Sequence, residues 1–523
     1  MNRDDQLHRL ETRSEPYDLI VIGGGATGLS AALDASSRGH SVLLIEQCDF
    51  AKGTSSRSTK LVHGGVRYLR QGNISLVREA LRERALLCLN APHLVHPLDF
   101  IIPVTRWWQA PFYSLGLKVY DALAGQLGMT SSRWLSAQTA MELLPGIKPA
   151  GLMGGVLYQD GQFDDARLAI TLARTAVEQG AMMLNYFRCD HLIKANGIVA
   201  GVSAVDVETR KTHEIRGRCV INATGVFVDD LRRKDDATKA PILSVSQGIH
   251  LVLPAAFLPG RRALMVPETD DGRVFFAVPW HGRVIVGTTD TPVEGTTLEP
   301  LAQENEIAFL LTHAERFLAR APQRSDVLSV FAGLRPLVRK GASNKTNKTA
   351  AISRDHFIEA SASGLITITG GKWTTCRKMA EDVINVAEKS AGLPARLCVT
   401  RNLPLKGAIQ ECSAIAHLSV YGSEAEQILQ LSQREPQLNQ LLHEKLPYLR
   451  AEVIWQVREE MARTVEDVLA RRTHALLLDA RASINVADDV AELMGRELGW
   501  NAGQCSQSAH SFREMAKAYV LTL

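Results

Sequence analysis

The sequence lacks several features that would have defined its class at once. No run approaches the roughly 18 consecutive apolar residues of a membrane-spanning helix, and we expect no secretory leader because the charged start has no apolar core. The eight cysteines form no Cys-x-x-Cys pair and no metal-ligand spacing is visible, so we expect reduced thiols in a cytosolic setting and no metal centre. The formal net charge is only +3, which does not favour nucleic acid as a partner.

The length and composition are those of a folded globular protein with several domains. A chain of 523 residues exceeds one ordinary core, so two or three domains are expected. The hydrophobic fraction of 46% and charged fraction of 22% fit a folded chain, and we find no internal repeat or low-complexity tract. Residues 1–15 are expected to form a disordered arm.

The most informative segment is YDLIVIGGGATGLSAALDASSRGHSVLLIEQ, residues 17–47. It predicts a buried strand, a glycine turn, a helix that ends at Gly39 and a second buried strand, which is a complete βαβ unit. Gly23, Gly25 and Gly28 have the G-x-G-x-x-G spacing, which permits a tight turn, close approach of a pyrophosphate and close helix–strand packing. Glu46 can accept a hydrogen bond from a ribose hydroxyl. The unit predicts dinucleotide binding, with FAD and NAD both open.

Two later segments also read as strands that run into small residues. CVINATGVFVDD, residues 219–230, places Ala223, Thr224 and Gly225 at a strand end, where a cofactor can approach closely. GLITITGGKWTT, residues 364–375, predicts a strand, a glycine turn and the start of a helix. A helix N-terminus and a lysine would both favour the negative charge of a reduced flavin. Ordinary strand-to-helix turns are the alternative in both places.

The stretch TSSRSTKLVHGGVRYL, residues 54–69, resembles neither a core strand nor a regular surface helix. Its hydroxyl side chains supply small donors for a pyrophosphate, and Gly64 and Gly65 would let the backbone pass close to a flavin ring. Arg57 and Lys60 are expected to face anionic groups, either cofactor or substrate phosphate.

Seven motifs occur together and in one order: IGGGATG, TSSRSTKLVHGGVRYL, NATG, VGTTD, GLRPL, SRDH and GGKWTT. As a set they resemble the FAD-dependent sn-glycerol-3-phosphate dehydrogenases of the respiratory chain, within the D-amino-acid-oxidase-like flavoproteins. The resemblance covers residues 16–390 and continues through residues 465–483, which are similar to the signature of the family's C-terminal helical domain. Val226 and Cys376 stand where the family usually has proline and tyrosine.

This resemblance implies a specific reaction. The enzyme would oxidise glycerol 3-phosphate to dihydroxyacetone phosphate, pass a hydride to FAD and then pass electrons to a membrane quinone. A glycerol-3-phosphate oxidase, which uses oxygen and releases hydrogen peroxide, is the main alternative because the motifs barely separate the two. An amine or amino-acid oxidase would need a carboxylate clamp in place of the phosphate cluster, and a non-catalytic flavin-binding protein would not need the catalytic candidates.

The reaction requires fixed positive charge for the phosphate and a base near the carbinol oxygen. Arg335 in GLRPL, Arg354 in SRDH and Arg57 are the candidates for the phosphate. His250 is the first candidate for the base because the resemblance implies an active-site histidine there, and an ordinary imidazole titrates near neutrality. His63 is the second candidate for the base. Arg335 could also polarise the alcohol oxygen, and Lys372 could serve substrate, flavin or both, so His250, Arg335 and Lys372 form the predicted catalytic set.

The predicted FAD contacts come from all of these segments. They are Gly23, Gly25, Gly28, Glu46, Thr54, Ser55, Ser56, Ser58, Lys60, His63, Gly64, Gly65, Ala223, Thr224, Gly225, Gly370, Gly371, Lys372, Trp373 and Thr374.

Residues 105–129, TRWWQAPFYSLGLKVYDALAGQLGM, mix aromatic and basic side chains in a way that suits a membrane interface. Because a quinone lies in the bilayer, we expect monotopic association with the cytoplasmic face of the inner membrane. Packing between domains is the alternative. The oligomeric state stays open, a homodimer being one option.

The expected fold class is α/β: a doubly wound Rossmann-type FAD domain with a mixed-sheet substrate domain, D-amino-acid-oxidase-like, plus a C-terminal α-helical domain. The FAD-binding domain is expected to be discontinuous, over residues 16–75, 150–240 and 340–395. The substrate and membrane-facing domain takes residues 76–149 and 241–339. The helical domain takes residues 400–523.

Overall fold

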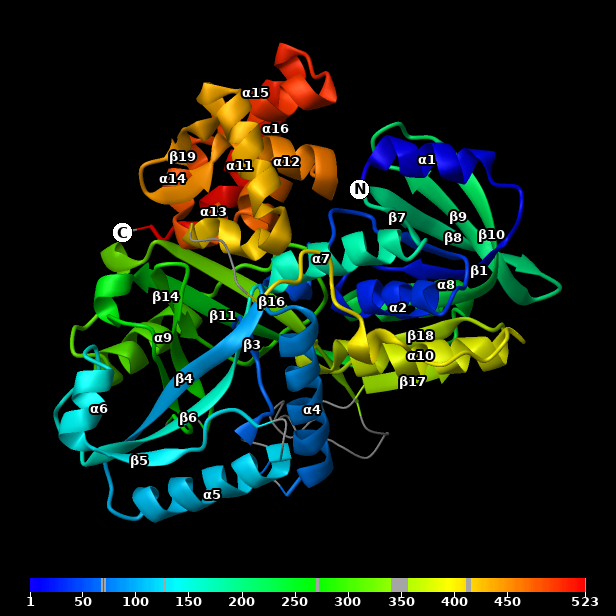
Figure 1. Ribbon diagram of the computed structural model, residues 1–523. Helices are drawn as coiled ribbons and strands as arrows, with labels where there is room; N and C mark the ends of the chain where they lie inside the picture. Colours follow the sequence, from blue (N-terminus) through cyan, green and yellow to red (C-terminus); the bar gives the residue numbers. More distant parts are fainter. Residues whose placement is uncertain are drawn as a thin grey trace.

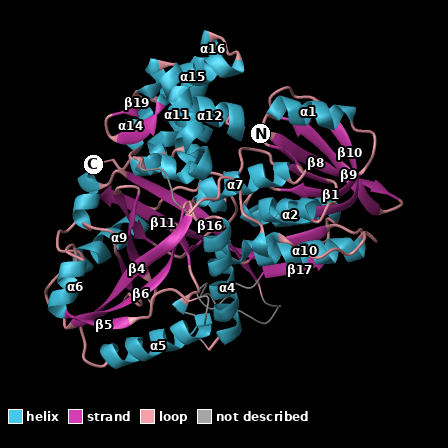
Figure 2. Cartoon of the chain, in the orientation of Figure 1, coloured by secondary structure: helices cyan, strands magenta, loops and turns pink. Residues whose placement is uncertain are grey.

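The computed structural model describes the whole chain except residues 67, 68, 70, 71, 126, 127, 270, 271, 340–355, 411–414 and 523. The described residues form two large sheets that lie beside each other, with a cluster of C-terminal helices across one end (Figure 1). The strands form the inner layers, and the helices cover them (Figure 2).

The first sheet is built around the predicted βαβ unit. Within the described residues its main path runs β17–β18–β10–β1–β2–β7, and β8 and β9 extend it as antiparallel strands beside β10. The central pairs are parallel, as the continuous apolar runs predicted. The bounds are β1 Tyr17–Ile22, β2 Val42–Ile45, β7 Met182–Leu184, β8 Phe187–Ala195, β9 Ile198–Asp206, β10 Thr212–Asn222, β17 His356–Ala360 and β18 Ile366–Gly370.

Three helices cover one face of this sheet. Helix α2, Ala26–Ser37, packs between α7, Asp165–Glu178, and α10, Cys376–Ser390 (Figure 1). All three contribute apolar side chains to one buried cluster with β1 and β2. This helix-covered parallel sheet is the predicted doubly wound domain. Helix α8, Val228–Asp235, follows the end of β10.

The second sheet is mixed, and its strands β11 and β16 contribute to the small cavity described below. Within the described residues its path runs β15–β11–β14–β13–β12–β4–β6–β3, with β16 beside β11 and β5 beside β6. Strands β13 and β14 form a hairpin, pairing antiparallel across His281 and Gly282, which both have positive φ. The bounds are β3 Leu61–Val62, β4 Val95–Val104, β5 Arg133–Ser136, β6 Gly154–Phe163, β11 Leu243–Pro254, β12 Ala263–Val266, β13 Phe275–Trp280, β14 Arg283–Gly287, β15 Thr291–Pro292 and β16 Ser329–Val338.

The helices around the second sheet include α5, which carries the predicted membrane segment. It lies at the end of the molecule away from the C-terminal helices (Figure 1). None of the described helices has both the length and the apolar character needed to cross a bilayer. The bounds are α4 Ile74–Asn90, α5 Gln109–Ala124, α6 Ala137–Leu143 and α9 Glu304–Phe317.

The C-terminal region is helical, as expected, and is not an isolated unit. Its apolar core includes Val252, Trp280, Ile285 and Phe331 from the second sheet. The region therefore shares a core with the sheet that holds the substrate cavity. Its elements are α11 Ala425–Arg434, β19 Leu441–His443, β20 Leu446–Leu449, α12 Arg450–Glu460, α13 Ala475–Leu478, α14 Ala480–Asn485, α15 Ala487–Leu498 and α16 Ala502–Ala516.

Two expectations about organisation are corrected. Residues 1–15 are not a disordered arm, because Arg3–Thr12 form helix α1, which docks through a 2.8 Å ion pair between buried Arg3 and Asp206 and through buried Leu10. The expected domain boundaries also shift, since β3 and β6 belong to the second sheet although they fall inside the ranges 16–75 and 150–240. A strand's partner, which its own sequence does not reveal, decides the domain to which it belongs.

Candidate active site

The glycine turn between β1 and α2 is packed backbone against backbone. Gly23 has φ +113°, and a Cβ on it would lie 2.5 Å from the carbonyl oxygen of Ala223. A Cβ on Gly28 would lie 1.9 Å from the carbonyl oxygen of Gly23. Any side chain at these two positions would force β1, α2 and β10 apart.

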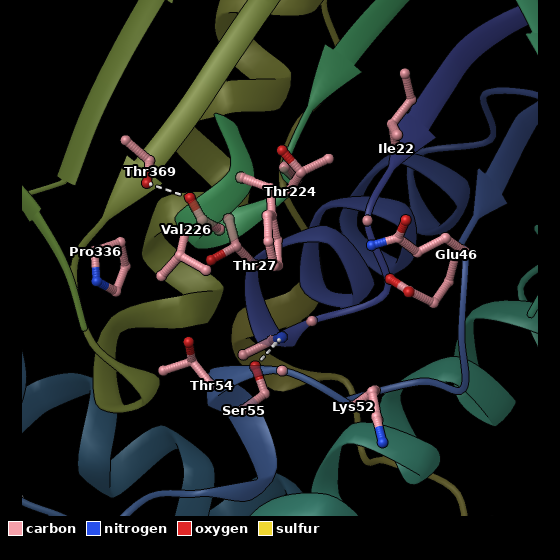
Figure 3. A pocket seen from close by; sticks show the side chains of 18 of the residues that line it. Ile22, Thr27, Glu46, Lys52, Thr54, Ser55, Thr224, Val226, Pro336 and Thr369 are labelled. Carbon is pink, nitrogen blue, oxygen red and sulfur yellow. Dashed lines mark hydrogen bonds between the residues drawn. The ribbon is translucent and has the colours of Figure 1, made fainter. Parts of the chain in front are cut away.

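A cavity of about 530 Å³ opens at the N-terminus of α2. The Ser55 hydroxyl accepts a 2.9 Å hydrogen bond from the amide of Ala26, in the first turn of this helix. Glu46 accepts from the amides of Gly24, at 2.6 Å, and Cys48, at 2.9 Å, while burial raises the pKa of its carboxyl. Figure 3 shows Glu46 and Ser55 on the wall of this cavity. A helix N-terminus facing a cavity suits a pyrophosphate.

The other predicted cofactor segments meet at the same cavity. Ala223, Thr224 and Gly225 line it, and the Thr369 hydroxyl donates a 3.2 Å hydrogen bond to the Gly225 carbonyl (Figure 3). The Trp373 indole donates a 2.8 Å hydrogen bond to the Ser55 carbonyl and so joins two segments that are far apart in sequence. The predicted contacts that line this cavity are Gly23, Gly25, Glu46, Thr54, Ser55, Ala223, Thr224, Gly225, Gly370, Gly371, Lys372 and Trp373.

A second cavity, of about 220 Å³, adjoins the first. The two share wall residues, so a small molecule in the second cavity would lie directly beside the cofactor. Among the predicted residues, the second cavity is also lined by His63, His250, Arg335, Arg57, Ser58 and Thr374. The shared residues are Thr54, Pro336, Gly371, Lys372 and Trp373.

His250 lies in β11 on the wall of the small cavity, and its exposed fraction is 2%. Its ring Nε2 lies 2.9 Å from the Thr59 hydroxyl, and its ring stacks on Phe331 with 4.8 Å between centroids. Burial, together with the positive charges of Arg335 and Lys60, holds the pKa of His250 well below its ordinary value. This corrects the expectation that the imidazole titrates near neutrality; the ring is neutral at pH 7.

Arg335 lies in β16, paired with Ser246 of β11. Its guanidinium donates to the carbonyl oxygens of Thr289, at 2.9 Å, and Gln247, at 3.2 Å, and lies 3.3 Å from the carboxylate of Asp290. A Cβ on Gly248 would lie 2.1 Å from this guanidinium, so the glycine provides the space that Arg335 occupies. The side chain is held in one place at the cavity wall.

Arg57 and His63, both from the stretch of residues 54–69, also line the small cavity. Arg57 is buried, donates a 3.1 Å hydrogen bond to the Ala332 carbonyl and forms a 2.7 Å ion pair with Glu299. The amide of His63 donates a 3.1 Å hydrogen bond to the Thr374 hydroxyl. Lys372 lines both cavities.

Several predicted contacts lie away from both cavities, and these predictions are corrected. Lys60 is fully buried, and its ammonium pairs with Asp165 at 2.7 Å, so it cannot face a cofactor or substrate phosphate. The Ser56 carbonyl accepts a 2.8 Å hydrogen bond from the same Lys60 ammonium. A Cβ on Gly64 would meet the Tyr120 hydroxyl at 2.4 Å, so this glycine allows packing against α5. Neither Gly64 nor Gly65 is among the residues that line these two cavities.

The remaining predicted residues differ in where they lie relative to the two cavities. Gly28 packs below the turn and lines neither cavity, and the Ser58 hydroxyl donates to Asp165 at 2.7 Å while the residue lines the small cavity. Arg354 lies outside the described residues, so its role stays a prediction. The roles assigned above to His250, Arg335 and Lys372 also stay predictions.

Two residues of the site were missed in the sequence. The Thr59 hydroxyl contacts Nε2 of His250, and Thr59 stands inside the hydroxyl-rich stretch of residues 54–69, where no role is predicted for it. Glu299 pairs with Arg57, and no local pattern marks it, because the pairing depends on the course of a loop from the second sheet.

One cluster of metal-ligand type occurs in the described part of the chain: Asp164, Asp165 and His474. Its charges are already matched by protein groups. The Lys60 ammonium lies 2.7 Å from Asp165, and His474 Nε2 lies 2.6 Å from Asp164. The cluster therefore serves as a junction where α7 meets the C-terminal helices.

Comparison with known proteins agrees with the cavity geometry. Residues 18–377 match the family of FAD-dependent oxidoreductases, and residues 398–505 match the C-terminal domain of alpha-glycerophosphate oxidase. The chain therefore belongs to the FAD-dependent oxidoreductases, and FAD is its cofactor. The glycine cradle, the helix N-terminus and the volume of the large cavity fit this group.

The relatives define the branch more narrowly. The chain is 41% identical over 535 residues to the mitochondrial glycerol-3-phosphate dehydrogenase of Homo sapiens, a match that covers 96% of this chain and 73% of that protein. The corresponding enzyme of Schizosaccharomyces pombe is 36% identical over 577 residues, covering 98% and 89%. The solved glycerol-3-phosphate dehydrogenase of Bacillus halodurans, complexed with FAD, is 31% identical with a TM-score of 0.81, covering 100% and 98%. The chain belongs to the glycerol-3-phosphate dehydrogenase family.

Proposed function

We propose that the protein oxidises sn-glycerol 3-phosphate to dihydroxyacetone phosphate, with FAD as hydride acceptor and a membrane quinone as the next acceptor. One observation carries the proposal: a small cavity lined by arginine, lysine and histidine shares a wall with the cofactor cavity. Positive groups suit a phosphate dianion, and a substrate bound in this cavity would have its carbon beside the cofactor across the shared wall. The names of the relatives support this substrate.

The phosphate is assigned to the arginines. Arg335 is fixed by two backbone carbonyls and Asp290, and Arg57 by a carbonyl and Glu299, so both present guanidinium groups that lose little freedom on binding. Lys372 adds positive charge where the two cavities meet. Arg354 is proposed as a further phosphate ligand.

The alcohol proton is assigned to His250. Its neutral ring can accept a proton, and the substrate hydroxyl would take the place that the Thr59 hydroxyl holds near Nε2. The same burial that keeps the ring neutral makes it a weak base, so proton acceptance has to coincide with hydride departure. When bound, FAD supplies the hydride acceptor. His63, the second candidate for the base, lines the same cavity.

Anaerobic bleaching of the flavin tests the substrate. We expect the absorbance of the oxidised flavin to disappear on addition of sn-glycerol 3-phosphate and to persist with glycerol, which lacks the phosphate, at the same concentration. Absence of bleaching by glycerol 3-phosphate in protein that carries its full complement of FAD would refute the proposed reaction.

The acceptor is tested separately because an oxidase is the alternative. The solved L-alpha-glycerophosphate oxidase of Mycoplasma pneumoniae shares the fold at 16% identity and a TM-score of 0.55, which leaves the acceptor open. We expect the reduced enzyme to be reoxidised much faster by a short-chain quinone analogue than by air-saturated buffer. Fast production of hydrogen peroxide would favour the oxidase.

The quinone places the enzyme at a membrane, and helix α5 is the proposed contact. Trp107, Trp108, Phe112 and Leu115 are exposed on it or just before it, with exposed fractions of 75%, 43%, 51% and 70%. We propose that these side chains enter the interface of the cytoplasmic leaflet while Lys118 and nearby basic groups meet lipid phosphates. A homodimer remains an open proposal that sedimentation analysis would decide.

Vesicle binding tests the membrane contact. The double substitution Trp107→Glu with Trp108→Glu should weaken sedimentation with anionic liposomes and leave flavin bleaching by glycerol 3-phosphate unchanged. A matched control adds the same two charges at exposed apolar positions elsewhere, Ile198→Glu with Leu441→Glu. Equal binding by both double variants would reject α5 as the contact.

A further inference from the structure

The carboxylate that pairs with Arg57 belongs to half-buried Glu299, in the loop that follows β15 of the second sheet. Arg57 lines the small cavity and packs against Gly333, where an added Cβ would lie 3.0 Å from the Arg57 Cβ. One side of the guanidinium donates to the Ala332 carbonyl at 3.1 Å, and the other donates to Glu299 at 2.7 Å. The orientation of this guanidinium at the cavity therefore depends on Glu299.

Glu299 is held by more than Arg57. Its carboxylate also pairs with the Lys52 ammonium and accepts a 3.1 Å hydrogen bond from the Tyr519 hydroxyl. The neighbouring residue, Leu298, lines the FAD cavity. Burial raises the pKa of Glu299, but Arg57 and Lys52 outweigh it, so the pKa stays below its ordinary value and the group is ionised. A single carboxylate thus joins three parts of the chain beside both cavities.

The C-terminal region holds the outer side of this junction. Lys52 also pairs with Glu466, which in turn lies 2.6 Å from the guanidinium of Arg471. In Figure 3 the Lys52 side chain points away from the centre of the FAD cavity. Alternating charges therefore run without a break from Arg471 in the C-terminal region to Arg57 at the small cavity.

We infer that Glu299 is a positioning residue for substrate binding: it holds Arg57 toward the substrate phosphate, and the C-terminal region sets its position through Tyr519 and Glu466. This inference rests on the proposed function. Without the carboxylate, Arg57 and Lys52 become neighbouring cations with no shared counter-ion, and their repulsion turns the guanidinium away from the cavity. The loss acts on phosphate binding and not on hydride transfer.

The primary test is the steady-state kinetics of Glu299→Gln holoenzyme with glycerol 3-phosphate. We expect KM to rise about tenfold, as for loss of one charge-assisted hydrogen bond, with kcat within about twofold. Glu299→Asp should recover part of the affinity, and Tyr519→Phe should raise KM by about two- to threefold. Glu435→Gln, which removes an exposed ion pair with Arg496, is the matched control and should change neither parameter.

A lower KM in Glu299→Gln would overturn the inference, because it would mean that the carboxylate only competes with the substrate for Arg57. An equal fall in kcat and kcat/KM would also overturn it, because that pattern marks a role in the transition state.

A double-mutant cycle separates positioning from general stabilisation. If Glu299 acts through Arg57, the KM of Arg57→Lys with Glu299→Gln should be close to that of Arg57→Lys alone. Independent, multiplying effects would show that Glu299 acts elsewhere and would overturn the inference.

Binding of inorganic phosphate distinguishes failure of this inference from failure of the proposed function. The midpoint of the flavin absorbance change on phosphate titration should rise about tenfold in Glu299→Gln relative to the unaltered protein. If glycerol 3-phosphate bleaches neither protein but this shift is seen, the proposed reaction fails and the positioning role stands. If bleaching occurs and no shift is seen, the positioning role fails alone.

Discussion

The two adjoining cavities are built in opposite ways. The glycine turns, the N-terminus of α2 and the strand ends that follow the predicted motifs line the FAD cavity. The small cavity, the proposed substrate site, draws its arginine, lysine and histidine side chains from separate segments, and both arginines are held by partners from other segments. Local sequence determines a backbone turn, whereas the position of a charged side chain depends on partners that lie far away in the chain.

The largest expected effect is a side chain placed in the glycine turn that lies beneath the FAD cavity. Gly28→Val should yield protein without bound FAD, because even the first carbon of the new side chain would lie 1.9 Å from the Gly23 carbonyl. The ratio of flavin absorbance to protein absorbance in purified material measures this.

Gly116→Ala is the matched control for that change. Gly116 lies inside helix α5 with nothing within 4 Å of its added Cβ, so the substitution should keep the full complement of FAD. Normal FAD content in Gly28→Val would show that the turn can open and that the cavity is less rigid than its geometry indicates.

The fold could be predicted to the extent that it follows local periodicity. The βαβ unit and the strand, turn and helix start of residues 364–375 formed where the sequence indicated. Helix α1 was missed because its docking depends on the Arg3–Asp206 pair, which joins positions 203 residues apart. The assignment of β6 failed for the same reason, since only its pairing with β4 shows which sheet it joins.

The site residues show the same difference between positions set by local sequence and positions set by distant partners. The glycine turn and Glu46 could be placed at the FAD cavity because Glu46 bonds Gly24 within the same βαβ unit, and Ser55 because it bonds the first turn of α2 in that unit. Lys60 could not, since its partner Asp165 lies 105 residues away and turns the ammonium into the protein interior. Glu299 left no local signal at all.

The second largest effect should come from removing the His250 ring from the small cavity. His250→Ala should slow anaerobic flavin reduction by about 10²–10⁴-fold, the usual contribution of a general base, with little change in KM. Stopped-flow absorbance at saturating glycerol 3-phosphate measures the rate. His63→Ala is the comparison, and a larger loss in that variant would transfer the role of the base to His63.

Arg335→Lys should produce a smaller and different loss. Lysine keeps the charge but cannot reach the Thr289 and Gln247 carbonyls and the substrate with one planar group. We expect KM to rise by about 10- to 100-fold, the equivalent of roughly 1.5–3 kcal/mol for a hydrogen bond to a charged group, with kcat reduced less. A loss confined to kcat would exchange the proposed roles of Arg335 and His250.

The smallest effect is the pH dependence of folding stability that the buried ring of His250 contributes. Because the folded-state pKa of His250 is depressed, the unfolded chain binds a proton that the folded chain does not, and stability from this residue is lost as pH falls below about 6.5. Between pH 8 and pH 5 this loss should reach about 2 kcal/mol, and His250→Gln should lack it. Urea unfolding of the holoenzyme at both pH values measures the difference, with exposed His510→Gln as the control. If His250→Gln loses as much stability on acidification as the unaltered protein, the ring already carries its proton in the folded state. That outcome would remove its assignment as the proton acceptor.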